Sequence, residues 1–554
     1  MVKAKKVVKI LLRSVLIFLA LIVSSLIILF IYLNSKLIGK PDFAAQFKSE
    51  VSGYKNLNDT TRTIGPNYLL KLEEGMYQMY VEGSPFHRGE VIGALTSDLH
   101  QYQEDAFINQ IRKIVPGEFY LKFLKYFVAF FNRDIQKYIP RENLEEIYGE
   151  SLHMSSDYDN IIGSPYMRIL NYHAAHDIGH ALQDKNFVAG CTSFAAWASR
   201  TEDKKLIVGR NFDFYVGDEF AKNKIVAFIA PDNGIPFGMV TWPGMLGVVS
   251  GMNKEQITIT INAAKSSYPT EAKTPVSILA RQILQYASTL DEAVKIAGKF
   301  DLFVSESLLI SSGKENKAII IEKSPEKMDV FSTTDSIIYC ANHFQSAAFA
   351  KDSINTNFKS ASSSDYRYAR LHELTDNKVI NTTSAVAILR NPFGLNNKEI
   401  GWGNEDALNQ LIAHHSVIFK PSEGIMYVST SPYQLGKYIQ FNLNEIFKDK
   451  SPVRSINKDI AADEEMIKKA NVPYQEFRKQ VNLIRNSASG NLKSNVELML
   501  KSNPDFYLGY EVAGDYYSKH KENNTAKFYY KRALSLNIPL RQDSLNIAVK
   551  LSKL

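Results

Sequence analysis

The amino-acid sequence predicts an α+β protein with stacked sheets, a transmembrane helix at its N-terminus and a helical tail at its C-terminus. Three observations support this fold class. Residues 14–33 contain no charge and are rich in Leu, Ile, Val and Phe. Between 192 and 428, strand-like segments come first, then helical segments, then strands again. Such blocks are typical of sheets packed face to face with helices segregated outside.

Residues 1–34 read as a basic flank followed by a signal anchor. The 20 uncharged residues 14–33 are long enough to span a bilayer as a helix. A cleavable signal peptide usually has a shorter apolar region and a small-residue cleavage site, and no such site follows Leu33. We therefore expect a retained anchor, with a cleaved signal as the alternative. The basic flank is expected in the cytoplasm, so the remaining chain would be periplasmic or extracellular. The flank contains Lys3, Lys5, Lys6, Lys9 and Arg13.

The segment before residue 191 is predicted to be mostly helical. Residues 35–75 are polar and mixed, and we expect a linker there. A short strand at 75–82 and a turn at 83–85 are followed by helical segments at 88–102, 119–131 and 166–184. The second of these carries aromatic residues at helical spacing, which predicts a core face. They are Phe119, Phe123, Tyr126, Phe127 and Phe130.

From Thr192 onward the pattern favours strands. Residues 257–262 alternate isoleucine with Thr or Asn, which predicts a strand that is buried on one face. Helical spacing returns at 276–300, 366–374 and 384–389. Two hairpins are predicted, at 308–331 and 417–428, with turns at 313–316 and 421–424.

The tail, residues 451–554, is charged and helical, and its last 50 residues resemble one tetratricopeptide unit. A single repeat cannot bury its own face, so it must pack on the preceding helices or on the catalytic domain. An ordinary helical hairpin is the alternative. Such a tail is a candidate binding site for a protein partner. The residues at repeat spacing are Tyr510, Ala513, Gly514, Tyr517, Ala526, Tyr530 and Ala533.

Composition narrows the function further. Hydrophobic residues make up 45% and charged residues 22%, which argues against wholesale disorder. The net charge of +7 is small for 554 residues and forms no basic stripe with interleaved aromatics, so no nucleic acid is expected as a partner. Two cysteines cannot build a disulfide framework or a four-thiolate zinc site. Cys340 lies in the apolar run 337–340 and is expected to be a buried hydrophobe.

Cys191 stands in a different setting, Gly190-Cys191-Thr192-Ser193. A free thiol is mostly protonated at neutral pH and needs a base to become a nucleophile. A cysteine at a chain start brings its own base, because its α-amine titrates near pH 8. Cys191 is internal as translated, so the Gly190–Cys191 bond would have to be cut first. Glycine suits that position because it has no side chain to obstruct attack on its carbonyl.

Several motifs together resemble the N-terminal-nucleophile (Ntn) hydrolases of the choloylglycine hydrolase and penicillin acyltransferase branch. The closer likeness is to the acyl-coenzyme A:6-aminopenicillanic acid acyltransferase type, over residues 70–435. The Gly-Cys-Thr-Ser motif at 190–193 and Gly-Arg-Asn-Phe-Asp at 209–213 carry most of the resemblance. Supporting segments in matching order are 83–89, 241–244, 251–253, 261–262, 341–344 and 364–371.

The resemblance implies a four-layer αββα sandwich and autoproteolysis into two chains, 76–190 as propeptide or α chain and 191–450 as the catalytic β chain. It implies Cys191 as nucleophile, Arg210 beside the thiol, and Asp213 holding the new α-amine. Asn262 and Asn342 would stabilise the oxyanion and the cysteine amine. A late arginine, Arg367 or its neighbour Arg370, would fix the charge network. It implies no cofactor and no metal. The expected activity is that of an amidase or acyltransferase acting on a small acylated amide or peptide.

Two other functions are open on the residues alone. One is a membrane-tethered scaffold that binds a partner through its tail. The other is a metallohydrolase, because His173, His176 and His180 share one face of a predicted helix. The residue after His176 is Asp177 rather than the glutamate of zinc metalloproteases, and no third ligand follows. The substrate class is not readable, since bile-acid conjugates, N-acyl amino acids, peptides and β-lactam side chains all fit a linear amide.

Overall fold

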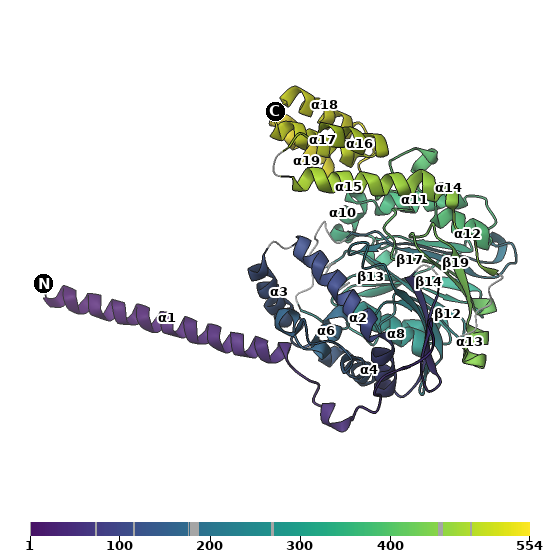
Figure 1. The fold of residues 1–554 in the computed structure, drawn as a ribbon, viewed down its shortest axis with the longest axis horizontal. Coiled ribbons are helices and arrows are strands. Elements are labelled where there is room, and N and C mark those ends of the chain that lie inside the picture. The colour runs from purple at the N-terminus through teal and green to yellow at the C-terminus, as the bar shows by residue number, and fades with distance from the viewer. Residues whose placement is uncertain are drawn as a thin grey trace.

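The computed structural model describes residues 2–72, 75–114, 117–174, 177, 188–267, 271–451, 458–487 and 490–554. Helix α1 (Val2–Leu37) projects away from the body as a single rod (Figure 1). Its segment Lys9–Leu37 is long and apolar enough to cross a membrane, by length and composition. The body follows, and helices α15–α19 stack at one end of it (Figure 1).

Two sheets make the centre of the body. The larger has 11 strands in the order β1-β2-β3-β4-β9-β10-β11-β12-β13-β14-β15, and the smaller has six in the order β16-β6-β7-β17-β18-β19. Within the larger sheet, β4 (Met76–Gly83) runs parallel to β9 (Lys224–Pro231). All other pairs of neighbouring strands in this sheet are antiparallel. A separate two-stranded ribbon joins β5 (Val188–Ala189) to β8 (Phe214–Tyr215).

The larger sheet contains β1 (Lys55–Asn58), β2 (Thr61–Ile64), β3 (Asn67–Lys71), β10 (Phe237–Thr241), β11 (Ser250–Asn253), β12 (Ile257–Ala263), β13 (Glu306–Ser312), β14 (Lys317–Lys323) and β15 (Met328–Phe331). The smaller contains β6 (Thr192–Ala196), β7 (Ile207–Phe212), β16 (Ile337–Cys340), β17 (His415–Lys420), β18 (Ile425–Ser429) and β19 (Tyr438–Asn442). Both predicted hairpins are present, as β13–β14 and β17–β18.

The two sheets pack face to face, and helices cover both outer faces. One apolar cluster joins Phe228 and Leu309 of the larger sheet to Val208 and Val417 of the smaller. The outer face of the larger sheet packs on α2 (Pro85–Ile114), α4 (Arg141–Ser151), α6 (Pro165–His173), α8 (Val276–Tyr286) and α9 (Leu290–Ala297). The outer face of the smaller packs on α11 (Ser364–Thr375) and α12 (Thr382–Leu389). The layer order is therefore helix, sheet, sheet, helix, as expected.

Strand β12 differs from its prediction in an informative way. Ile257, Ile259 and Ile261 face the helical layer, as period-two alternation requires. The opposite face was predicted to meet solvent, yet the whole strand is buried. The second sheet covers this polar face, so Thr260 pairs with Ser193 across the gap between the sheets. The inter-sheet space thus contains a polar zone beside its apolar core.

Two further expectations about the N-terminal part are wrong. Residues 35–75 are not merely a linker, because they contain β1, β2 and β3 at the edge of the larger sheet. The aromatic face of α3 (Glu118–Phe131) is not core, since Phe123, Phe127 and Phe130 are 65%, 41% and 49% exposed. Helical spacing predicts that one face is apolar, but it does not say what covers that face.

Instead of entering the body, α3 packs on the end of α1. Leu33 and Leu37 of α1 form a small buried cluster with Ala129, and Tyr126 packs against it. The ring of Phe30 lies 5.5 Å from that of Tyr126. Figure 1 shows α3 at the end of the body where α1 emerges. The exposed aromatic residues therefore adjoin the candidate membrane span.

The tail consists of α15 (Val472–Asn486), α16 (Lys493–Ser502), α17 (Tyr507–Lys519), α18 (Asn523–Leu534) and α19 (Arg541–Ser552). Ala513, Ala526, Tyr530 and Ala533 are buried between these helices, and the ring of Tyr530 lies where a side chain on Gly514 would stand. The predicted helical tail is present, whereas the choice between a tetratricopeptide unit and an ordinary helical hairpin stays open. The tail also packs on the body, because Leu411 and Leu435 belong to the tail's core.

Candidate active site

Cys191 lies between the short strand β5 and strand β6, and its side chain is completely buried. The ribbon β5–β8 sets the chain just before it, since Gly190 N donates to the backbone oxygen of Asp213 at 3.1 Å. Both cysteines are free, and Cys340 is also buried. Burial raises the pKa of the Cys191 thiol to about 11, with Arg210 opposing this rise. In this structure the thiol is therefore protonated at neutral pH.

Arg210 crosses the inter-sheet gap from β7 to the larger sheet. Its Nη2 donates to Cys191 Sγ at 3.8 Å and also to the carbonyl oxygen of Ile261. Its Nη1 donates to Val249 O at 2.6 Å and to the hydroxyl of Ser250. The guanidinium lies over the ring of Phe212, 4.3 Å from its centroid. These contacts fix a buried positive charge beside the sulfur, and a fixed positive charge favours the thiolate.

Asp213 follows β7 directly and is fully buried, yet its carboxyl oxygens accept no hydrogen bond from the described residues. Burial raises the pKa of this carboxyl to about 7, although Arg367 and Arg210 both lower it in part. A buried carboxyl group without a donor is costly and calls for an explanation. These carboxyl oxygens have the capacity to accept hydrogen bonds from a donor placed beside them.

Arg367 reaches the cysteine from α11, on the far side of the smaller sheet. Its Nη1 donates to Cys191 O at 2.7 Å and to Thr192 Oγ1 at 2.8 Å, and its Nη2 donates to Asn342 Oδ1 at 2.7 Å. Arg370 points elsewhere, to the side chains of Asn391, Asn397 and Glu373. Of the two arginines left open by the sequence, Arg367 is therefore the one that contacts Cys191.

The two asparagines flank the same place. Asn262, on β12, accepts from Ser193 Oγ at 2.9 Å and donates to Cys340 O at 2.9 Å and Ala341 O at 3.2 Å. Asn342 donates to Ala263 O at 2.8 Å while it accepts from Arg367. Both carboxamides thus tie the end of β12 to the end of β16. In this structure their donor groups are directed at backbone carbonyls.

The structure therefore gathers Cys191, Arg210, Asp213, Asn342 and Arg367 around one buried position, with Asn262 tied to Ser193 beside it. Two neighbours were not singled out from the sequence. Thr192 provides a hydroxyl to Arg367, and Gln410 donates from Nε2 to Gly190 O at 2.9 Å. Thr192 stands inside the Gly-Cys-Thr-Ser motif, whereas no sequence signal connects Gln410 to residue 190, which is 220 positions away.

A small pocket of about 30 Å³ with aromatic walls lies beside Phe212. Phe214 stacks on Phe212 at 5.6 Å and on Trp242 at 6.3 Å, and Phe220 meets Trp242 edge-on at 5.5 Å. Phe212, Trp242 and Cys191 belong to one apolar cluster. The pocket is lined by Gln103, Glu104, Phe107, Tyr172, Phe214, Phe220, Trp242 and Pro243. Its walls are mainly apolar, with a few polar groups at one side.

Of the three histidines considered as metal ligands, the structure describes only His173. His173 is buried, its Nδ1 lies 2.8 Å from Ile169 O, and its Nε2 accepts from Leu246 N at 2.9 Å. Burial lowers the pKa of His173, so the ring is neutral and holds the loop that follows Trp242. His176 and His180 lie outside the described residues. Within the described ranges, no group of three or more His, Cys, Asp or Glu side chains could hold a metal ion.

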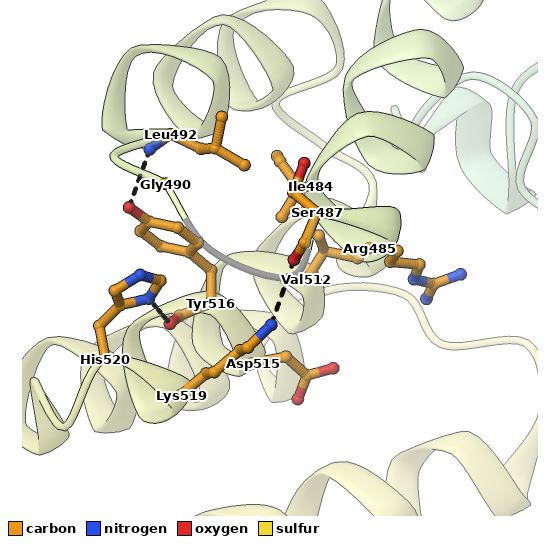
Figure 2. A pocket seen from close by; sticks show the side chains of 10 residues that line it. All are labelled: Ile484, Arg485, Ser487, Gly490, Leu492, Val512, Asp515, Tyr516, Lys519 and His520. Atoms are coloured by element: carbon orange, nitrogen blue, oxygen red, sulfur yellow. Dashed lines mark hydrogen bonds between the residues drawn. The ribbon is translucent and has the colours of Figure 1, made fainter.

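A second hollow lies in the tail, away from the cysteine (Figure 2). Figure 2 shows Tyr516 and His520 along one side, with Leu492 N donating to Tyr516 OH at 3.0 Å. Lys519 reaches across to donate to Ser487 O at 3.2 Å. These polar groups bond one another, so the hollow has the features of a gap between helices rather than of a reaction centre.

Comparison with known proteins gives matches to part of the chain. A worm relative, the N-acylethanolamine-hydrolyzing acid amidase of Caenorhabditis elegans, is 27% identical over 227 residues, which are 39% of this chain and 59% of that protein. An uncharacterized protein of Archaeoglobus fulgidus is 29% identical over 283 residues, which are 48% of this chain and 46% of the relative. The match thus spans about half the length of these curated relatives.

Three solved structures are similar at low scores. The Caenorhabditis elegans ortholog of that amidase has a TM-score of 0.32 at 18% identity and covers 42% of this chain and 93% of its own. A conjugated bile acid hydrolase of Clostridium perfringens has a TM-score of 0.32 at 15% identity, and the match covers 46% of this chain and 93% of that one. Penicillin V acylase of Agrobacterium tumefaciens has a TM-score of 0.32 at 13% identity, covering 47% and 88%.

The family comparison covers the centre of the body, residues 199–429. Its matched region starts eight residues after Cys191, so it includes Arg210, Asp213, Asn262, Asn342 and Arg367 but not the cysteine itself. The resemblance predicted from the motifs is confirmed: residues 199–429 match the acyl-coenzyme A:6-aminopenicillanic acid acyl-transferase family.

Proposed function

We propose that this chain is a self-processing cysteine amidase or acyltransferase of the N-terminal-nucleophile type. The observation that carries the proposal is the setting of Cys191. Its sulfur lies 3.8 Å from Arg210 Nη2, its carbonyl oxygen accepts from Arg367, and the unpartnered carboxyl of Asp213 is held nearby. A thiol, two fixed cations and an unpartnered carboxylate suit a nucleophile that gains its own α-amine.

The first step would be cleavage of the chain. Cys191 Sγ attacks the carbonyl carbon of Gly190, a C–S bond forms, and the carbonyl electron pair moves to oxygen. Collapse expels the Cys191 nitrogen, which takes up the thiol proton and leaves a thioester. Water then hydrolyses the thioester to the Gly190 carboxylate and the free Cys191 thiol. The net reaction consumes one water and creates the α-amine.

The mature site would then use that amine as its base. The Asp213 carboxylate would hold the ammonium form and fill the hydrogen bonds that the uncleaved chain leaves open. The thiolate, stabilised by Arg210, attacks an amide carbonyl, and the amine passes its proton to the leaving nitrogen. An acyl-cysteine remains until water or another amine takes the acyl group. Water gives an amidase, and an amine acceptor gives an acyltransferase.

The substrate we propose is a small acylated amide with an apolar acyl group. The aromatic pocket of Phe214, Phe220 and Trp242 adjoins Phe212, whose ring lies under Arg210, and such walls favour hydrocarbon over charge. Its volume is only about 30 Å³ in the uncleaved chain, so it must widen before an acyl group can enter. Cys191, Arg210 and Asp213 are completely buried in the uncleaved chain. Cleavage after Gly190 frees a new chain end beside them, and release of that end would admit the substrate.

We further propose that the enzyme acts at a membrane surface, with α1 as a retained anchor and the body outside the cytoplasm. The length and apolar composition of α1 support the anchor. The exposed rings of Phe123, Phe127 and Phe130, next to the body end of α1, support contact between the body and the bilayer interface. Apolar acyl amides concentrate at such an interface, which agrees with the proposed pocket.

The experiment is intact mass measurement on the purified full chain beside Cys191→Ala. We expect the wild type to yield a fragment of 364 residues that starts at Cys191, since 554 − 190 = 364, and the mutant to stay whole. The cleaved protein is then assayed on a panel of N-acyl amides, with Cys340→Ala as the matched cysteine control. Wild-type protein that remains whole and shows no amidase activity overturns the proposal in favour of the tail-binding scaffold.

A further inference from the structure

Gln410 is a buried residue that contacts the bond proposed to be cut. Its Nε2 donates to the carbonyl oxygen of Gly190 at 2.9 Å, and the residue is 1% exposed. The opposite placement of the carboxamide would direct its oxygen at another oxygen, so the donating orientation is the one consistent with the contact. The carbonyl oxygen of Gly190 is also where negative charge would develop when Cys191 attacks.

The same contact leaves no room for a side chain at residue 190 while the Gln410 carboxamide keeps its place. A Cβ atom placed on Gly190 would stand 2.5 Å from Nε2, 2.8 Å from Oε1 and 3.1 Å from Cδ of Gln410. Distances this short are not tolerated, so any larger residue would displace the carboxamide. Glycine at 190 and glutamine at 410 are therefore complementary in shape as well as through the hydrogen bond.

We propose that Gln410 is a catalytic residue of chain cleavage, whose amide N–H stabilises the oxyanion formed on Gly190 as Cys191 attacks. This inference rests on the proposed function, because it concerns the self-processing step. In that step the carbonyl π electrons move to oxygen, the Gln410 N–H bond stays intact, and the hydrogen bond strengthens as charge builds. Donors already aimed at a developing oxyanion act without reorganising.

The asparagines implied by the family resemblance are otherwise engaged in this uncleaved state. Asn262 Nδ2 donates to Cys340 O and Ala341 O, and Asn342 Nδ2 donates to Ala263 O. Gln410 and the asparagines therefore stabilise different oxyanions. Gln410 acts on the carbonyl of the chain itself, whereas the asparagines are left for the oxyanion of a bound substrate.

The segment that carries Gln410 is held by hydrogen bonds on both sides. Asn409 donates from Nδ2 to Arg390 O at 3.1 Å and accepts from Leu411 N at 3.1 Å. Asn409 N donates to Asn391 O at 2.9 Å. Leu411 has a left-handed backbone, with φ of 53°. This local geometry sets the direction in which the Gln410 side chain leaves the backbone.

The tail supports the same segment. Leu411 is completely buried and belongs to the tail's core with Tyr474 and Phe477 of α15. Upstream, two hydrogen bonds join Trp402 to Asn503 of the tail. Trp402 N donates to Asn503 Oδ1 at 2.9 Å, and Asn503 Nδ2 donates to Trp402 O at 2.8 Å. The tail therefore positions Gln410, which gives it a role inside the enzyme and not only at its surface.

The test compares buried glutamines in the full chain. Gln410→Met removes the donor at nearly constant shape. Gln434→Met is the matched control, because Gln434 is equally buried and its side chain contacts no polar partner in the described part of the chain. We measure the rate at which the 364-residue fragment appears in a cell-free synthesis chase. We expect Gln410→Met to cleave roughly 10²–10³-fold more slowly and Gln434→Met to cleave at the wild-type rate. Equal rates for wild type and Gln410→Met overturn the inference.

A second variant covers the case in which Gln410→Met misfolds. A protonated carboxyl donates a hydrogen bond, whereas a carboxylate repels an oxyanion, so Gln410→Glu should cleave faster as the pH falls. A merely structural role gives Gln410→Glu the pH profile of the wild type, which overturns the inference. Failure of the proposed function is distinguishable, because then the wild type itself is not cut at Gly190–Cys191.

Discussion

Arg367 Nη1 donates to the carbonyl oxygen of Cys191 at 2.7 Å, although the two residues are 176 positions apart in the chain. The same guanidinium holds Thr192 and Asn342, so one side chain joins α11, β6 and the end of β16. A planar group with several fixed donors is needed for this, and the point charge of a lysine cannot replace it.

The first prediction follows from that contact. Arg367→Lys should lower the rate of amide cleavage by about tenfold or more, because a hydrogen bond from a charged donor contributes about 1.5–3 kcal/mol. Arg370→Lys is the control, since Arg370 is as buried but bonds Asn391, Asn397 and Glu373 instead. Steady-state kinetics on the best amide substrate measures both. Equal losses in the two variants would contradict a specific role for Arg367.

The second prediction concerns the thiol. Cys191 is completely buried and burial raises its pKa to about 11, so the uncleaved chain should react slowly with iodoacetamide at pH 7.5. After cleavage the reaction should become much faster, because the new amine and the released chain end expose and activate the sulfur. Mass spectrometry of tryptic peptides measures labelling at 191 and 340. Fast labelling of Cys191 before cleavage would refute the prediction.

The third prediction concerns pH. The pKa of Asp213 is raised from 3.8 to about 7 by burial, so folding favours its protonated form. A folded pKa above the unfolded value contributes stability at low pH, and this contribution is lost as the pH rises through 7. In a Cys191→Ala background, which stays uncleaved, stability should therefore fall between about pH 4 and pH 7 and then level off. One pKa unit corresponds to about 1.4 kcal/mol.

Asp213→Asn in the same background should show a smaller fall, because an amide does not titrate. The other buried carboxyls with raised pKa values, Asp177 and Glu405 among them, are present in both proteins, so the difference isolates Asp213. Urea denaturation at several pH values gives the two curves. Parallel curves would mean that Asp213 is ionised in the uncleaved chain.

The fourth prediction concerns α3. In vesicles that contain a photoactivatable lipid, the peptide with Phe123, Phe127 and Phe130 should be labelled, because these rings are exposed beside α1. Phe528, on the tail, is 64% exposed and provides the control for exposure alone. Its peptide should remain unlabelled. Labelling of both peptides, or of neither, would argue against an interfacial position for α3.

The fifth prediction connects the tail with processing. Gly403 has φ of 83°, and a Cβ there would stand 2.2 Å from the ring of Tyr474. Gly403→Ala should therefore loosen the tail's contact and slow chain cleavage by displacing the segment of Gln410. Gly490→Ala is the control, since Gly490 also has positive φ but no atom lies within 4 Å of its Cβ position. The backbone strain alone is about 1–3 kcal/mol in either variant.

Cleavage rates and melting temperatures of both variants are compared. Gly490→Ala should lose some stability and cleave as the wild type does. If the two variants slow cleavage equally, the effect comes from backbone strain and not from the tail's contact with Gly403.

Most of the fold could be read from local patterns. Period-two alternation predicted β12, and turn residues predicted the hairpins β13–β14 and β17–β18. Two elements could not be judged that way. The strands β1 and β2 are short and mostly polar, and they join the larger sheet through β3, which pairs with β4. The aromatic face of α3 has a core-like spacing, yet its neighbour is α1, and spacing does not identify a neighbour.

The sequence by itself determined the long apolar N-terminal helix, the layer order and the residue set around Cys191, because these depend on runs, periods and motifs within short stretches. Only the tertiary structure decided between Arg367 and Arg370, left the carboxyl of Asp213 without a donor, and brought Gln410 to Gly190. Each of these depends on contacts between segments more than a hundred residues apart or on burial by a second layer. Packing of one sheet against the other creates such contacts, and no pattern along the chain encodes them locally.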